Sequence, residues 1–144
     1  MEKVEKALAL QDAGANCAES VFSVFAPDFG IDAGTALKIA CGLGGGVGRQ
    51  ALVCGAVTGA VLALGLRYGR TDPSDSAKKM DTYGKVRELA EAFAAARGSI
   101  QCRDLMGCDI STPAGMQKAK DERLFKTVCA SCIRDAVRIA ESMI

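Results

Sequence analysis

The stretch GLGGGVGRQALVCGAVTGAVLALGL, residues 42–66, decides the fold. Within it, residues 50–66 form a run of seventeen without a charge. A membrane-spanning helix needs about 20 consecutive apolar residues, so this shorter run, rich in glycine and alanine, predicts a central buried helix. Gly55 and Gly59 have the GxxxG spacing that allows a second helix to approach closely. That face could belong to the core or join two copies as a homodimer.

Helical periodicity continues on both sides of this run. Apolar residues recur at helical spacing, and no stretch alternates as a half-buried strand does. We therefore predict an all-α fold in a single domain, residues 1–144, as one compact bundle of about five to six helices around the central glycine- and alanine-rich helix. The expected helices cover about Glu2–Ala13, the segment from the cap Asn16 to Pro27, Asp32–Cys41, residues 50–66, Asp75 or Ser76 to Arg97, and Asp121–Met143, with an irregular segment at Gly98–Pro113.

Composition excludes several classes of function. Eighteen basic and seventeen acidic residues leave a formal net charge of +1. Nucleic acids and anionic membranes normally bind a concentrated basic face, so we expect neither as a partner. The sequence contains no histidine, which excludes a Ser-His or Cys-His relay, HExxH zinc chemistry and CxxCH haem attachment. Chemistry must therefore use sulfur, carboxylate, lysine or arginine.

The sequence contains seven cysteines, so sulfur is the group most suited to carry the protein's chemistry. The first residues include acidic side chains and no long apolar core, unlike a secretory signal. We therefore expect a reducing cytoplasm, where gathered thiols indicate metal binding or redox chemistry more often than structural disulfides. A buried cysteine can also serve as a small apolar residue, and we assign Cys41 and Cys108 that role.

The remaining cysteines lie where helical periodicity points them inward. Cys129 and Cys132 share one face of the last expected helix. They lie about two turns inside it, whereas a thioredoxin-type pair sits at a helix N-terminus, so the placement favours metal ligation over dithiol chemistry. Cys17 and Cys54 face inward, and Cys102 lies in a segment that could cover the bundle. Thiols from four separate elements could then meet in the core.

Several segments resemble the C-GCAxxG-C-C family, named for its cysteine pattern and described as redox-active. They are NCAESV (16–21), GLGGG (42–46) with Arg49, CGAVTGA (54–60), CRDLMG (102–107), and Cys129 before the C-terminal helix. The resemblance implies that the functional thiols are Cys17, Cys54, Cys102 and Cys129. Whether Cys132 replaces or supplements Cys129 stays open. A similar cysteine domain occurs in split-Soret cytochromes, which implies an iron–sulfur centre.

An iron–sulfur centre, with [2Fe–2S] favoured, is the expected cofactor. Four thiolates around an oxidised [2Fe–2S] core carry about two net negative charges, whose burial requires nearby positive groups and N–H donors. Arg49 and Arg103 are the expected cations, and backbone N–H groups around Gly45 and Gly46 the expected donors. The protein would act in electron transfer or redox sensing, with a redox protein or a small-molecule reductant as partner. Whether it is an enzyme is left open.

Two alternatives remain. A structural zinc ion also takes four thiolates, although zinc sites usually draw ligands in close pairs from small loops. A metal-free dithiol/disulfide oxidoreductase would cycle Cys129 with Cys132, or Cys54 with Cys102. Reactive thiols need solvent access, which inward faces limit.

Overall fold

Side-chain caps begin several helices in the computed structural model, which describes residues 2–144, and three of them concern residues that the sequence suggests. Each cap accepts a hydrogen bond from a backbone N–H in the first helical turn. The sequence predicts the first two and offers Asp75 or Ser76 for the third, because capping depends only on residues within one turn. They are Asn16 before α2 (Cys17–Phe25), Asp32 before α3 (Ala33–Ala40) and Asp75 before α6 (Ser76–Arg97).

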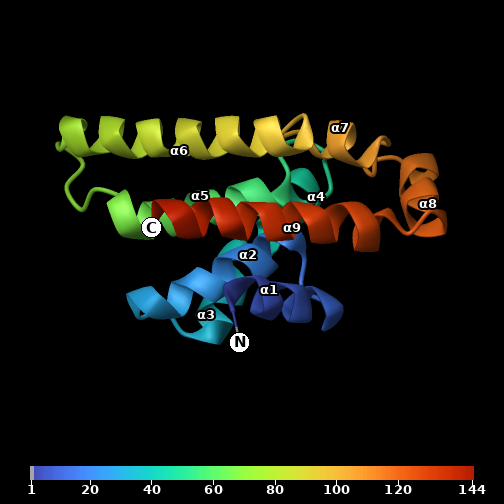
Figure 1. Ribbon diagram of the computed structural model, residues 1–144, viewed down its shortest axis with the longest axis horizontal. Helices are drawn as coiled ribbons and strands as arrows, with labels where there is room; N and C mark the ends of the chain where they lie inside the picture. Colours follow the sequence, from blue (N-terminus) through green and yellow to red (C-terminus); the bar gives the residue numbers. More distant parts are fainter. Residues whose placement is uncertain (1) are drawn as a thin grey trace.

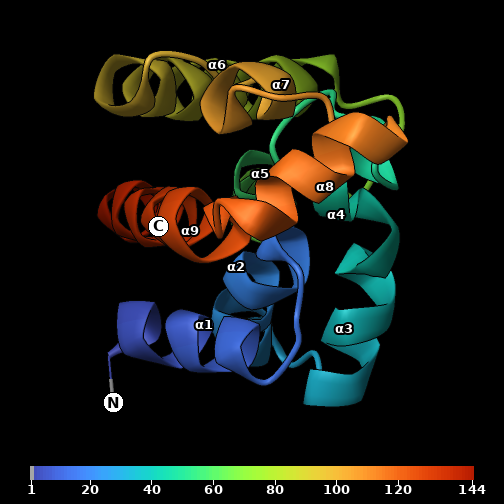
Figure 2. The same cartoon turned by 90° about the vertical axis from the view of Figure 1, so that its right-hand side faces the viewer.

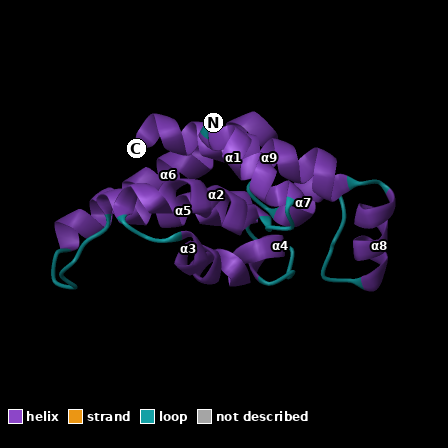
Figure 3. Ribbon diagram, turned by 90° about the horizontal axis from the view of Figure 1, so that it is seen from below, coloured by secondary structure: helices purple, strands orange, loops and turns teal. Residues whose placement is uncertain are grey.

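The all-α class is confirmed. Residues 2–144 contain no β-strand, only an isolated antiparallel bridge between Val53 and Gln101 (Figure 3). The helices are more numerous than expected, because the chain between α6 and the last helix forms two short helices and the glycine-rich segment forms another. Two 3-10 turns add to these. The other elements are α1 (Lys3–Asp12), η1 (Ala26–Phe29), η2 (Cys41–Leu43), α4 (Gly44–Val47), α5 (Gly55–Tyr68), α7 (Cys102–Met106), α8 (Pro113–Asp121) and α9 (Leu124–Met143).

The helices lie in three tiers (Figures 1 and 2). α6 and α7 form one outer tier, α5 and α9 the middle, and α1, α2 and α3 the other outer tier. α5 packs against α2, α6 and α9. The largest fully buried side chains come from all three tiers: Phe22, Phe25, Phe93, Leu64, Leu89 and Ile133.

The central helix begins at Gly55, five residues later than the uncharged run suggests. The three residues just before it, 52–54, pair with the segment before α7. The Cys54 N–H donates to the Ile100 carbonyl oxygen at 2.8 Å, and the Cys102 N–H donates to the Leu52 carbonyl oxygen at 2.6 Å. This non-local pairing satisfies backbone groups that a longer helix would otherwise satisfy. None of the helices in residues 2–144 has the length and apolarity to cross a membrane.

The GxxxG face of α5 lies against α2. A Cβ built on Gly59 would lie 2.7 Å from the Ala18 carbonyl oxygen, and one on Gly55 would lie 3.2 Å from the Cys17 Cβ. Both glycines therefore allow the α2 backbone to approach α5. Since this face is used inside the molecule, it is not available to join two copies, and the homodimer stays a prediction.

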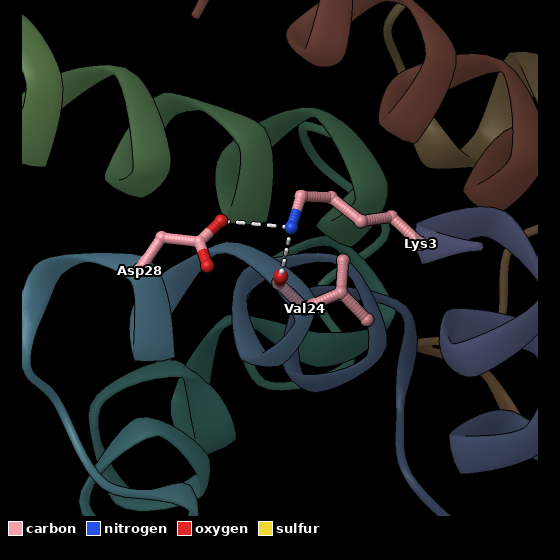
Figure 4. Close-up of polar contacts among 3 residues, drawn as sticks. All are labelled: Lys3, Val24 and Asp28. Atoms are coloured by element: carbon pink, nitrogen blue, oxygen red, sulfur yellow. Dashed lines mark hydrogen bonds and ion pairs between the residues drawn. The ribbon is translucent and has the colours of Figure 1, made fainter. Parts of the chain in front are cut away.

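The Lys3 side chain of α1 binds residues at the end of α2 and in η1 (Figure 4). Its Nζ donates to the Val24 carbonyl oxygen at 3.2 Å and to Asp28 Oδ2 at 2.8 Å. Such partly exposed ion pairs contribute about 0–1 kcal/mol. The packing of α1 against α2 and α9 therefore contributes more to the stability of its position than this ion pair does.

The last helix begins at Leu124 and not at Asp121, because Arg123 has a left-handed backbone with φ of 56°. The later half of this helix faces the core, where Cys132, Ile133, Ala136, Val137 and Ala140 are buried. Phe125, Val128 and Cys129, at its earlier end, are only half-buried.

Candidate functional site

A cavity of about 630 Å³ lies where the first turn of α2, the α4 turn, the start of α5, α7 and the first half of α9 meet. Its volume falls within the ~300–1,000 Å³ typical of small-molecule sites. Exposed residues, among them Gly48 and Arg49, form part of its wall, so the cavity opens to solvent. Six of the seven cysteines line it: Cys17, Cys41, Cys54, Cys102, Cys129 and Cys132.

Cys17 is placed by the cap that starts α2. Asn16 Oδ1 accepts the Glu19 N–H at 2.8 Å, and Glu19 Oε1 accepts the Asn16 N–H at 3.0 Å, closing a capping box. The Asn16 Nδ2 also donates to the Cys41 carbonyl oxygen at 3.0 Å. A Cβ on Gly44 would overlap the Asn16 side chain. Cys17 is therefore held at the first helical position, against the glycine-rich turn.

The backbone pairing of their two segments brings Cys54 and Cys102 near each other, since each directly follows a residue of the Val53–Gln101 bridge. Both sulfur-bearing residues are buried, with 6% and 8% of their surface exposed. Cys54 is also the N-cap of α5, although its side chain accepts no capping hydrogen bond. The Val57 N–H donates to the Cys54 carbonyl oxygen at 3.0 Å. Its sulfur therefore lies at the start of a helix whose first backbone N–H groups have no side-chain cap.

Cys129 and Cys132 approach these thiols from α9. The Cys129 side chain meets that of Cys17, and the Cys132 side chain meets that of Cys54. Cys129 Sγ also lies 3.7 Å from Met106 Sδ. Cys132 is more deeply buried than the rest, with 1% of its surface exposed. The thiols therefore form two neighbouring pairs, with Cys102 beside them.

Contact and burial shift the pKa values of these thiols in different directions. Contact with Cys129 and burial hold the pKa of Cys17 well above its ordinary value. Burial raises the pKa of Cys102 to about 12. Contact with Cys54, together with burial, raises the pKa of Cys132 strongly. The pKa of Cys54 is lowered by its contact with Cys132 and by the Ala56 and Val57 N–H groups, against the effect of burial.

The charges of two arginines lower the pKa values of buried thiols. Arg103 lowers the pKa of Cys102 by its charge, and its guanidinium donates to the Ala51 carbonyl oxygen at 3.0 Å. Arg97 acts in the same way on Cys132, and its buried Nε has no hydrogen-bond partner. Arg49, the other expected cation, lies exposed on the cavity wall. Sequence reasoning missed Arg97, because only tertiary packing brings the end of α6 to α9.

The glycine-rich turn forms one wall of the cavity with a left-handed backbone. Gly45 and Gly46 have φ of 63° and 67°, and both line the cavity. Val47 and Arg49 also have left-handed backbones, with φ of 64° and 65°. This conformation costs a non-glycine residue roughly 1–2 kcal/mol. Strain of this kind clusters at functional sites. The turn's role as a hydrogen-bond donor to a bound centre stays a prediction.

The cavity contains all four thiols that the resemblance selects, and also Cys132. Cys41 is exposed at its edge, so its predicted role as a buried apolar residue is wrong. Cys108 is partly buried and lies outside the lining, near Cys102. In the part of the chain that the structure describes, no group of three or more Cys, Asp or Glu side chains is arranged to hold one metal ion.

A protein-family model matches most of the chain. The family model described as "Putative redox-active protein (C_GCAxxG_C_C)" matches residues 15–143, a span that includes every cysteine of the cavity. No curated protein and no solved structure matches the chain.

Proposed function

Since the chain belongs to the C_GCAxxG_C_C family, described as redox-active, we propose that its cavity holds a [2Fe–2S] centre bound by four thiolates. The ligands are Cys17, Cys54, Cys102 and Cys129. The observation that carries the proposal is the convergence of these thiols, from four separate elements, on one cavity. When bound, such a centre supplies one-electron transfer. The protein would serve in electron transfer or redox sensing in the cytoplasm, with a redox protein or small-molecule reductant as partner.

The arrangement of the thiols fits a dinuclear centre better than a zinc ion. In a [2Fe–2S] centre each iron takes two cysteines, so thiols arranged as neighbouring pairs suffice. A structural zinc ion needs four ligands around one point, and the thiols do not form such a group. Cys17 meets Cys129, and Cys54 has two neighbours, Cys102 and Cys132. The family pattern selects Cys102 from those two.

The surroundings also suit a buried anionic centre. The charges of Arg103 and Arg97 act on Cys102 and Cys132, and the N–H groups at the start of α5 face Cys54. Positive groups and N–H donors stabilise the more negative reduced state and so raise the reduction potential. The apolar core around Cys54 limits the access of water to that side of the site.

Anaerobic purification with iron, sulfide and zinc analysis tests the proposal. We expect iron and acid-labile sulfide in equal amounts, near two of each per chain, and a visible absorption band that reductant bleaches. A preparation that stays colourless and iron-free after reconstitution with iron and sulfide would overturn the proposal. One zinc ion per chain would instead support the structural alternative.

The metal-free dithiol alternative gains a different pair from the structure. The sequence favours Cys129 with Cys132 or Cys54 with Cys102. The side-chain contacts instead join Cys54 to Cys132 and Cys17 to Cys129. The first of these pairs combines a thiol at a helix N-terminus with a buried partner.

A further inference from the structure

Cys132 has no role in the four-cysteine pattern, yet it is the most deeply buried thiol of the cavity. It belongs to the same apolar core cluster as Cys54 and meets the Cys54 side chain. An extra cysteine serving only as a small apolar residue would need no second thiol beside it. The placement therefore indicates a role shared with Cys54.

We propose that, in protein without a metal centre, Cys54 and Cys132 form a dithiol that reduces a low-molecular-weight disulfide admitted through the cavity. This activity goes beyond the binding of a metal centre and does not depend on it. A cavity of about 630 Å³ is large enough for a ligand of this size. It leads from the exposed edge at Arg49 to the buried pair.

Cys54 is the attacking sulfur and Cys132 the resolving one. Cys54 retains 6% exposure against 1% for Cys132, and Cys54 stands at the N-cap of α5, whereas Cys132 lies inside α9. A helix N-terminus with free N–H groups stabilises a thiolate. Cys132 lies behind it on α9, within reach of the Cys54 sulfur but shielded from the incoming disulfide.

The exchange balances without any further oxidant. The Cys54 thiolate attacks one sulfur of the disulfide RSSR, forming the mixed disulfide Cys54–S–S–R and releasing RS⁻, which takes up a proton. Cys132 then loses its proton and attacks the Cys54 sulfur, releasing the second RS⁻, which is protonated in turn. Two protein thiols are oxidised to one disulfide, and the disulfide substrate is reduced to two thiols.

The closed disulfide would remove Cys54 from the metal ligands. Oxidation of the pair and binding of the centre at Cys54 therefore exclude each other. This links the proposed exchange to the loading of the site, since a disulfide-rich environment would keep the cavity free of metal.

Oxidised glutathione, added without oxygen to chelator-treated protein, tests the inference. After acid quenching and alkylation, peptide mass spectrometry should find a Cys54–Cys132 disulfide in the unmodified sequence. Cys132→Ala should retain glutathione on Cys54 as a mixed disulfide, and at least tenfold more of it than the unmodified chain. Cys108→Ala is the matched control, since Cys108 lies outside the cavity lining, and should behave as the unmodified chain does. Circular dichroism confirms that each variant is folded.

Two results would overturn the inference: a Cys54 that pairs mainly with Cys102 or Cys17, or a Cys132→Ala variant without glutathione on Cys54. Disulfide mapping of the unmodified chain decides the first even if a variant fails to fold. Iron and sulfide content after reconstitution is measured separately. A protein that binds iron but forms no Cys54–Cys132 disulfide contradicts only this inference, whereas one that forms the disulfide but binds no iron contradicts only the proposed centre.

Discussion

Replacing Gly59 by alanine should separate the two helices that carry Cys17 and Cys54. The new Cβ would lie 2.7 Å from the Ala18 carbonyl oxygen and 3.1 Å from the Ala18 Cα. Ordinary contact begins at 3.4 Å, so α2 and α5 must move apart locally by about 0.7 Å. Both opposing atoms belong to the backbone of a helix, so no side-chain rotation relieves the overlap.

The expected change in stability follows from two opposing effects. Overpacking of a well-packed contact costs roughly 1–3 kcal/mol, and replacing a helical glycine by alanine returns roughly 1 kcal/mol. Because the overlap is with backbone, we take the upper half of that cost and expect a net loss of about 1–2 kcal/mol. Gly65 is the matched control on the same helix, since a Cβ there meets nothing within 4 Å. Gly65→Ala should therefore stabilise the protein by roughly 0.5–1 kcal/mol.

Urea unfolding of the two variants, followed by circular dichroism, measures the difference in the free energy of unfolding. We expect Gly59→Ala to be about 2 kcal/mol less stable than Gly65→Ala. Equal stabilisation by both substitutions would refute the close α2–α5 contact, and with it our explanation of the second glycine in CGAVTG.

Three further predictions concern the cavity. Cys102→Ala should lose most of the reconstituted iron and Cys41→Ala almost none, as measured by metal analysis, and loss of iron in Cys41→Ala would show that the ligands are wrongly assigned. Gly46→Ala should lower the free energy of unfolding by roughly 2–5 kcal/mol, because residue 46 has a φ of 67° and the new Cβ would lie 2.5 Å from the Leu52 nitrogen. Thermal unfolding measures this effect, and a melting temperature equal to that of the unmodified chain would contradict the left-handed turn. In metal-free protein, the pKa of Cys102 is raised from 9.0 to about 12. The folded state therefore retains a proton that the unfolded state releases, and the free energy of unfolding should fall as pH rises from 9 towards 12. Urea unfolding at several pH values should show a shallower fall for Cys102→Ala, and identical slopes for the two proteins would count against the raised pKa.

Features governed by neighbouring residues were predictable from the sequence. The caps Asn16, Asp32 and Asp75 begin their helices as expected, since each hydrogen bond closes within one turn. Non-local pairing was not predictable. Gln50 begins an uncharged run that looks helical throughout, but residues 52–54 within it pair with residues 100–102. The break at Arg123 was also missed, because a left-handed arginine carries no sequence signal.

For the candidate site, the sequence identified the thiols but not their partners. Inward-facing periodicity and the family resemblance led to four cysteines that line one cavity. Neither revealed that Cys132 meets Cys54, because α9 and the start of α5 are far apart in sequence. Arg97 was missed for the same reason, since its place at the end of α6 resembles an ordinary surface cation. Tertiary packing alone brings it within reach of Cys132.

Iron K-edge X-ray absorption of the anaerobically reconstituted protein tests the central claim most directly, because it reports the atoms around each iron. We predict an inner shell made only of sulfur and a second iron as the next neighbour. An inner shell of oxygen or nitrogen, or iron without an iron neighbour, would contradict a dinuclear centre held by the cavity's cysteines.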